Sequence, residues 1–165
     1  MIDFKKEANY IKEELIAIRR DLHEHPEIGF QEFRTSGVIK DFLKKEGIPY
    51  IEVAKTGVCG ILKGTKEGDS NRTIALRGDI DGLPMTDMKT CEYKSQENGR
   101  MHACGHDAHT TILLGVAKVL NKYKDQFSGN VKLFFEPAEE TTGGAPHMIK
   151  EGVLDNPKVD CVIGL

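Results

Sequence analysis

Three of the six histidines in this sequence fall with a cysteine and an aspartate in one short segment, 101–109, with the sequence Met-His-Ala-Cys-Gly-His-Asp-Ala-His. In an extended loop Cys104 and His106 point to the same side, because side chains alternate. A thiolate and an imidazole suit zinc, and manganese, cobalt and nickel are compatible with them. The alternative is a polar loop whose histidines bond to backbone groups, but a dense Cys/His tract is typical of metal binding. We therefore predict a metal site, with further candidate residues at His102, Asp107 and His109.

Two neighbouring glutamates, Glu139 and Glu140, follow an apolar run that ends at Phe135. Adjacent ionised carboxylates repel each other, so a cation is needed to compensate for them near a core. If Glu140 ligates the metal, Glu139 can face the metal-bound water and act as general base. The alternative is a pair of solvated glutamates at a helix start, where the helix dipole favours negative charge.

Two aspartates, Asp79 and Asp81, come at the end of another β-rich run. They share a side if the strand continues, and either one can hydrogen-bond a ligating histidine from outside the metal's own ligand set. We expect support of this kind rather than direct ligation. A turn built from Asp and Gly is the plain alternative.

The elements that must position these groups are visible in the periodicity of the sequence. One helical stripe with alternating steps of four and three predicts a first helix that stops before Pro26; its members are Phe4, Ala8, Ile11, Leu15, Ile18 and Leu22. Further helices are expected near 35–47, 112–123 and 144–152, with Gly47 placed as a C-terminal cap. Strands are expected at 48–53, 58–63, 73–77, 131–135 and 159–165, with a turn at 64–71. Strands alternate with helices in the later half, which indicates a layered α/β domain with its chemistry in loops at strand ends.

Composition excludes several classes of protein. The 165 residues carry 23 Lys and Arg against 26 Asp and Glu, for a formal net charge of -3, and there is no basic tract, so nucleic acid is not an expected partner. We recognise neither a secretory signal nor a membrane span, and we expect a cytoplasmic protein that does not bind membranes. Its four cysteines form no C-x-x-C pair and should be thiols in that compartment. The last apolar run continues to Leu165, so we expect residues 1–165 to be the N-terminal part of a longer catalytic domain.

Taken together, these segments resemble the amidohydrolase branch of the metallo-aminoacylases, within the zinc aminopeptidase-like metallopeptidases. That branch includes hippurate hydrolases, indole-acetyl-amino-acid hydrolases and N-acetyl-diaminopimelate deacetylases. The resemblance covers nearly the whole chain and rests on five segments in order: RRDLH followed by Pro26-Glu27, ALRGDID at 75–81, MHACGHD at 101–107, PAEE at 137–140, and Gly143-Gly144-Ala145. Local departures are Glu136, where the family commonly has Gln, and Gly78 and Gly82 in place of the usual alanines.

The resemblance implies an α/β/α layered catalytic domain with a mixed, largely parallel sheet and two divalent metal ions. Cys104, His106 and Glu140 match metal ligands, Glu139 matches the catalytic base, and Asp79 and Asp81 match supporting residues. We assign catalysis to Glu139 and Asp81. Further ligand histidines of the family lie beyond residue 165. So does its lid domain, through which we expect the parent protein to form a homodimer or homotetramer.

The implied reaction is hydrolysis of a small N-acyl amino acid to an amino acid and a carboxylic acid. A metal-bound hydroxide attacks the amide carbonyl, and Glu139 moves the proton to the leaving amine. Two alternatives are an inactive, truncated metal-binding fragment and a dipeptidase or carboxypeptidase of the same superfamily. A hydrolase with Cys104 as nucleophile is a weaker hypothesis, because it leaves the paired glutamates unexplained.

Overall fold

The structure is a computed structural model that describes residues 2–68 and 72–165. Its elements in chain order are α1 (Phe4–Tyr10), α2 (Lys12–Glu24), α3 (Phe33–Lys45), β1 (Tyr50–Val53), β2 (Gly57–Lys63), β3 (Thr73–Asp79), α4 (His106–Lys122), the short 3-10 helix η1 (Lys124–Gln126), β4 (Asn130–Glu136), α5 (Ala145–Lys150) and β5 (Cys161–Gly164). All four expected helical regions and all five expected strands are present, with shifted ends. The expected turn at 64–71 is described only as far as Gly68, and its last three residues lie outside the described part.

The five strands form one mixed sheet in the order β1-β2-β4-β3-β5. β1 pairs with β2 and β2 with β4 in antiparallel fashion, whereas β3 is parallel to both β4 and β5. The mixed α/β sheet is therefore confirmed, but parallel pairing does not predominate among the described strands. The β1–β2 pair is antiparallel because a tight turn joins these consecutive strands, and β4 then adds to β2 as a second antiparallel pair.

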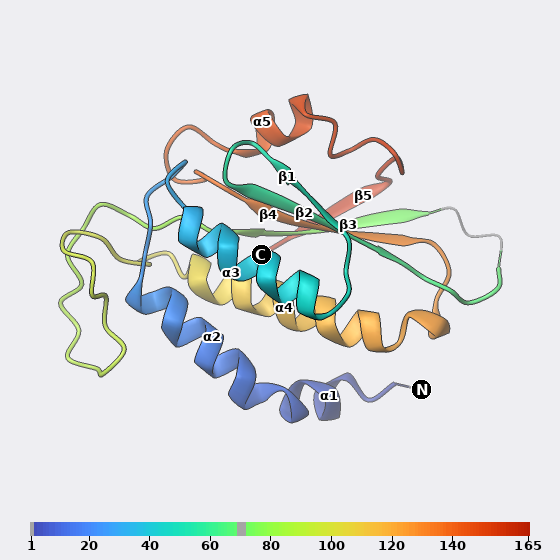
Figure 1. Cartoon of the computed structure of the whole chain (residues 1–165), viewed down its shortest axis with the longest axis horizontal. Helices are drawn as coiled ribbons and strands as arrows, with labels where there is room; N and C mark the ends of the chain where they lie inside the picture. Colours follow the sequence, from blue (N-terminus) through green and yellow to red (C-terminus); the bar gives the residue numbers. More distant parts are fainter. Residues whose placement is uncertain (1, 69–71) are drawn as a thin grey trace.

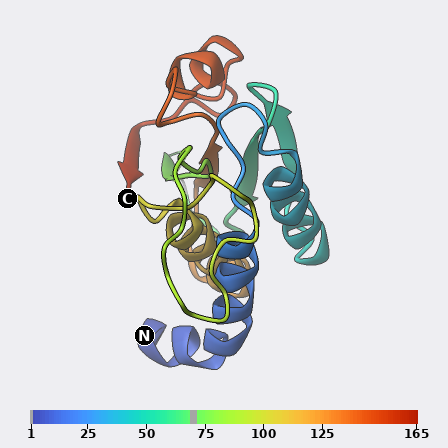
Figure 2. The ribbon, with the colours of Figure 1, turned by 90° about the vertical axis from the view of Figure 1, so that its left-hand side faces the viewer.

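Helices cover both faces of the sheet, which confirms the three layers (Figures 1 and 2). On one face α3 and α4 pack their apolar sides on β2 and β4, in a core that includes Ile39, Leu43, Leu114, Leu133 and Phe135. On the other face α5 and the segment after it cover a smaller cluster around Phe134, Met148 and Val153. The alternation of side chains along β4 sends Leu133 and Phe134 to opposite layers.

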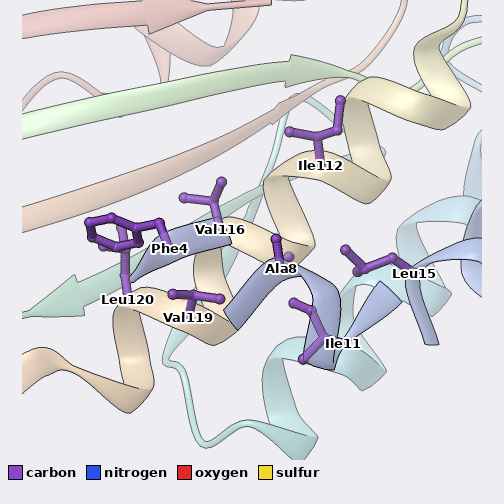
Figure 3. Close-up of a pocket in the computed structure, with 9 residues that line it drawn as sticks. Phe4, Ala8, Ile11, Leu15, Ile112, Val116, Val119 and Leu120 are labelled. Carbon is purple, nitrogen blue, oxygen red and sulfur yellow. The ribbon is translucent and has the colours of Figure 1, made fainter. Parts of the chain in front are cut away.

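The first helical stripe is divided between two helices, contrary to the expectation of one. At Ile11 the backbone leaves helical values, with φ -98° and ψ 4°. The side-chain spacing continues through this residue, so the pattern alone does not show the break. Between α1, α2 and α4 lies an apolar groove of about 310 Å³ (Figure 3), lined by Phe4, Ala8, Ile11, Leu15, Ile112, Gly115, Val116, Val119 and Leu120.

One local expectation agrees with the structure. Gly47 has φ +67°, which is the left-handed cap conformation expected after α3. Within residues 2–68 and 72–165, no helix has the length and apolar character needed to cross a membrane.

Candidate metal centre

The predicted metal ligands meet at the carboxyl ends of β3 and β4, beside the first turn of α4. Cys104, His106 and Glu140 each present one ligand atom, and the three atoms lie within 4.8 Å of one another. β3 and β4 are parallel and in register, with Asp79 opposite Glu136, so the loops that follow them leave the sheet side by side. The cluster therefore combines the loop before α4 with the loop after β4.

Gly105 determines how Cys104 and His106 are joined. It is the N-cap of α4 with φ 89° and ψ 20°, in the left-handed region. The expectation that this pair lies in an extended loop is therefore wrong, because α4 begins at His106 itself. The two side chains still converge, because the left-handed turn at Gly105 brings Cys104 and His106, the first residue of α4, to one side. L-residues with a side chain rarely adopt this conformation.

The imidazole of His106 is held by one aspartate and faces three other carboxylates. Its Nδ1 lies 3.0 Å from both Oδ1 and the backbone oxygen of Asp81. Nε2 lies 3.4 Å from Asp79, 3.7 Å from Glu140 and 3.9 Å from Glu139. Burial alone would lower the pKa of His106, but the hydrogen bond with Asp81 and the nearby carboxylates raise it. With the proton on Nδ1, Nε2 is the nitrogen available to a metal.

The charge balance of the cluster fits a cation. A hydrogen bond to Glu140, partial desolvation and the charges of Glu140, Glu139 and Asp79 raise the pKa of Cys104 to about 11. The thiolate therefore needs a compensating positive charge, and a soft sulfur beside nitrogen and oxygen donors suits a divalent transition metal. The donor set thus fits the metal that the sequence predicts.

A second group of three possible ligands shares His106. Asp79, His106 and His109 also place ligand atoms within 4.8 Å of one another. Oδ1 of Asp79 lies 2.7 Å from Nδ1 of His109, and the two imidazoles are stacked with their ring centres 5.6 Å apart. Asp79 and His109, both named from the sequence, therefore lie directly beside the first group.

Asp81 connects the two loops of the cluster. In addition to its contact with His106, its Oδ2 accepts the backbone N–H of Glu140 at 3.0 Å. Burial opposes ionisation of Asp81, but these hydrogen bonds outweigh it and the pKa of the carboxyl is lowered. The expected hydrogen bond between a supporting aspartate and a candidate ligand histidine is present.

The structure does not bring Asp107 and His102 into either group. The Asp107 carboxylate is buried and turned toward α2, where it lies 2.5 Å from Nδ1 of His23 and 3.0 Å from Nε of Arg19. His102 is buried with both ring nitrogens unpaired, and burial lowers its pKa to about 4. Asp107 is adjacent in sequence to His106, but the first turn of α4 directs the two side chains to different sides.

Arg77 is the residue that the sequence analysis missed. Its Nη1 lies 2.6 Å from Asp79, its Nε 2.6 Å from Glu136, and its Nη2 3.9 Å from Glu139. Burial lowers the pKa of the guanidinium, but the hydrogen bond to Glu136 and the three carboxylates raise it overall. The signal was the spacing, because residues two apart in a strand share a face and place Arg77 beside Asp79.

The comparisons with known proteins identify the family of the chain. A family model described as "Peptidase family M20/M25/M40" matches residues 75–165, more than half of the chain. The chain belongs to this family. Among solved structures, a dinuclear metal binding peptidase of the M20 family from Bacillus subtilis has a TM-score of 0.87 and 40% identity, over 94% of this chain and 43% of that one.

Two curated relatives are similar over nearly all of this chain. It is 46% identical over 152 residues to an IAA-amino acid hydrolase ILR1-like protein of Arabidopsis thaliana, covering 92% of this chain and 33% of the relative. It is 43% identical over 171 residues to an N-acetyl-L-cysteine deacetylase of Bacillus subtilis, covering 100% of this chain and 40% of the relative. The chain therefore spans between a third and two fifths of the length of these relatives.

Proposed function

We propose that residues 1–165 are the N-terminal part of the catalytic domain of a metal-dependent amidohydrolase that cleaves N-acyl amino acids. The observation that carries this proposal is the convergence of Cys104, His106 and Glu140 within 4.8 Å, with Glu139 beside them. Membership of the M20/M25/M40 peptidase family supports hydrolysis of an amide bond. The structural relative described as dinuclear supports a pair of metal ions.

In this proposal Cys104, His106 and Glu140 hold one divalent ion, and Asp79 and His109 contribute to a second beside it. The proposal thus makes Asp79 a ligand, where the sequence led us to expect support, because its carboxylate lies in the second group of possible ligands. Bound ions supply Lewis-acid chemistry that activates water and polarises the amide carbonyl. We propose zinc, manganese, cobalt or nickel, since the mixed sulfur, nitrogen and oxygen donors suit transition metals.

The general base of the proposed reaction is Glu139. Its carboxylate is partly exposed and lies 3.9 Å from His106 Nε2, so it can reach both solvent and the proposed ligands. It takes a proton from the attacking water and gives it to the nitrogen of the leaving amino acid. Asp81 supports this step by fixing the His106 ring and the backbone of Glu140.

The proposed substrate class follows from what the names of the two relatives share. One is named for an IAA-amino acid and the other for N-acetyl-L-cysteine, so the acyl groups differ while both substrates are acylated amino acids. We therefore propose an N-acyl amino acid as the substrate.

We also propose a cytoplasmic protein that assembles as a homodimer or homotetramer through a lid domain like that of its family. Free thiols at Cys59, Cys91, Cys104 and Cys161 support a reducing compartment. Gel filtration with light scattering of the complete natural protein tests the assembly, and a monomer would contradict it.

The proposed function is tested on the complete natural protein by metal analysis and by release of free amino acid from acetyl, benzoyl and indole-acetyl amino acids. We expect Cys104→Ser to lose metal and Glu139→Gln to keep metal but lose hydrolysis by orders of magnitude. Matched controls are Cys161→Ser and Glu67→Gln, both at exposed positions outside the cluster. Unchanged turnover in Glu139→Gln contradicts its role, and hydrolysis of dipeptides alone favours the peptidase alternative.

A further inference from the structure

Arg77 occupies a central place between the strands that carry the site. It lies in β3, and its guanidinium contacts Asp79 on its own strand, Glu136 on β4 and Glu139 in the loop after β4. Its Nη1 also donates to the backbone oxygen of Leu165, after β5, at 3.3 Å. One side chain therefore joins three neighbouring strands and the loop that carries the proposed base.

One carboxylate oxygen of Glu136 binds this guanidinium, and the other binds the end of the loop after β4. Its Oε2 accepts from Nε of Arg77 at 2.6 Å, and its Oε1 accepts the backbone N–H of Ala145 at 2.8 Å. Glu136 is buried, so little water competes for either bond. Ala145 is the first residue of α5, so Glu136 anchors both ends of the segment 137–144 in which Glu139 lies.

Glu139 itself has few means of orientation. Its side chain is 39% exposed, and its two charged contacts are Arg77 Nη2 and His106 Nε2, each at 3.9 Å. Within the described residues its carboxylate accepts no hydrogen bond from the protein. A general base must be held close to a productive geometry, and small displacements cost large factors in rate.

We propose that Arg77 is a positioning residue whose guanidinium, fixed by Glu136, holds the Glu139 carboxylate beside His106. This inference rests on the proposed function, because it assigns Arg77 a role through the proposed base. Glu136 accepts from both Arg77 and Ala145, whereas a Gln at 136 keeps one acceptor oxygen and turns its NH2 group toward the other donor. Glu136→Gln should therefore preserve only part of the arrangement.

The test measures kcat, KM, metal per chain and thermal unfolding of the complete natural protein with an N-acetyl amino acid as substrate. We expect Arg77→Met to lower kcat about 10–100-fold, with KM and metal content nearly unchanged. Glu136→Ala should lower kcat in the same way. The kcat of Glu136→Gln, which keeps one of the two acceptors, should lie between those of Glu136→Ala and the natural protein. The control is Arg72→Met, the same exchange at an exposed arginine just before β3.

The decisive measurement is the double variant Arg77→Met with Glu139→Gln. If Arg77 acts through Glu139, the double variant is no slower than Glu139→Gln alone. A further loss as large as that of Arg77→Met alone, an unchanged kcat in Arg77→Met, or loss of metal in Arg77→Lys and Glu136→Ala overturns the inference. If Arg77→Met does not fold, Arg77→Lys takes its place in the cycle. Full activity of Glu139→Gln overturns the proposed function instead, so the two failures are distinguishable.

Discussion

The carboxylate of Asp81 lies 3.0 Å from Nδ1 of His106, on the side of the ring away from the proposed metal. The same carboxylate accepts the backbone N–H of Glu140, so one buried aspartate orients two of the three ligands proposed for the first ion, from different loops. Such partners outside the ligand set fix the tautomer of a ligating histidine and raise its basicity.

Replacement of Asp81 should therefore weaken metal binding without removing a ligand. In Asp81→Asn the side-chain oxygen can accept from either His106 Nδ1 or the backbone N–H of Glu140. The side-chain NH2 group then faces the other of these two donors. We expect the metal affinity to fall about 10–100-fold, measured by competition with a chelating dye. Asp41→Asn, at an exposed position of α3, is the control. An unchanged affinity in Asp81→Asn contradicts this role.

Asp107 should act on stability rather than on metal binding. Its buried carboxylate pairs with His23 and Arg19 across the packing of α4 on α2. We expect Asp107→Asn to lower the free energy of unfolding in urea by about 1–3 kcal/mol, measured with metal chelated. Metal per chain should remain that of the natural protein. Loss of metal with unchanged stability would instead place Asp107 among the ligands.

Two glycines should respond in opposite directions to the same exchange. At Gly144 a Cβ atom would lie 1.9 Å from the backbone oxygen of Pro137, so the loop must move, although its φ of -74° suits alanine. At Gly37, inside α3, a Cβ atom has no described neighbour within 4 Å beyond the backbone of its own helix and the adjacent residues. We expect Gly144→Ala to destabilise by about 1–3 kcal/mol and Gly37→Ala to stabilise by about 0.5–1 kcal/mol. Urea unfolding of both variants checks the signs, and equal shifts contradict the steric argument.

The buried Glu32 predicts a pH dependence of stability. Burial raises the pKa of Glu32 above 4.5, despite hydrogen bonds from Thr56 and Ala138. The folded state therefore keeps a proton at pH values where the unfolded chain has released it. Its stabilising contribution is complete below pH 4.5 and is lost as the pH rises through the raised pKa.

Comparison with Glu32→Gln isolates this contribution, because the other titrating groups are common to both proteins. From about pH 4 to about pH 8 we expect the natural protein to lose stability relative to the variant. Urea unfolding at a series of pH values measures the difference. A natural protein that gains stability relative to Glu32→Gln as the pH rises contradicts the raised pKa.

The parts of the site that the sequence predicted are those encoded locally. Cys104 and His106 are two residues apart, and Glu139 and Glu140 are adjacent, so type and spacing were enough to select them. A contact of Asp79 or Asp81 with a ligating histidine was expected from chemistry, since such a histidine needs a partner for its second nitrogen, and the structure shows it between Asp81 and His106. The helical and strand periods likewise placed the elements and the layered α/β class.

The parts that could not be predicted depend on long-range placement or on backbone angles. The ion pair of Arg77 with Glu136 joins β3 to β4, and the contact of Asp107 with His23 joins α4 to α2. Neither is encoded in a local pattern. The order that inserts β4 between β2 and β3 is also a property of the tertiary fold. The break at Ile11 is a change of dihedral angles that leaves the hydrophobic spacing unaltered.

The left-handed backbone of Gly105 gives the proposed metal centre a stereochemical requirement at a residue that has no side chain. Apart from its two chain neighbours, no described residue has an atom within 4 Å of the place where an L-alanine would put its methyl group, so space is not the obstacle. The obstacle is chirality, since an L-residue in this conformation costs roughly 1–2 kcal/mol. For a D-residue the same angles are the ordinary helical ones, and no such cost arises. The position between Cys104 and His106 therefore discriminates between L- and D-residues rather than between small and large side chains.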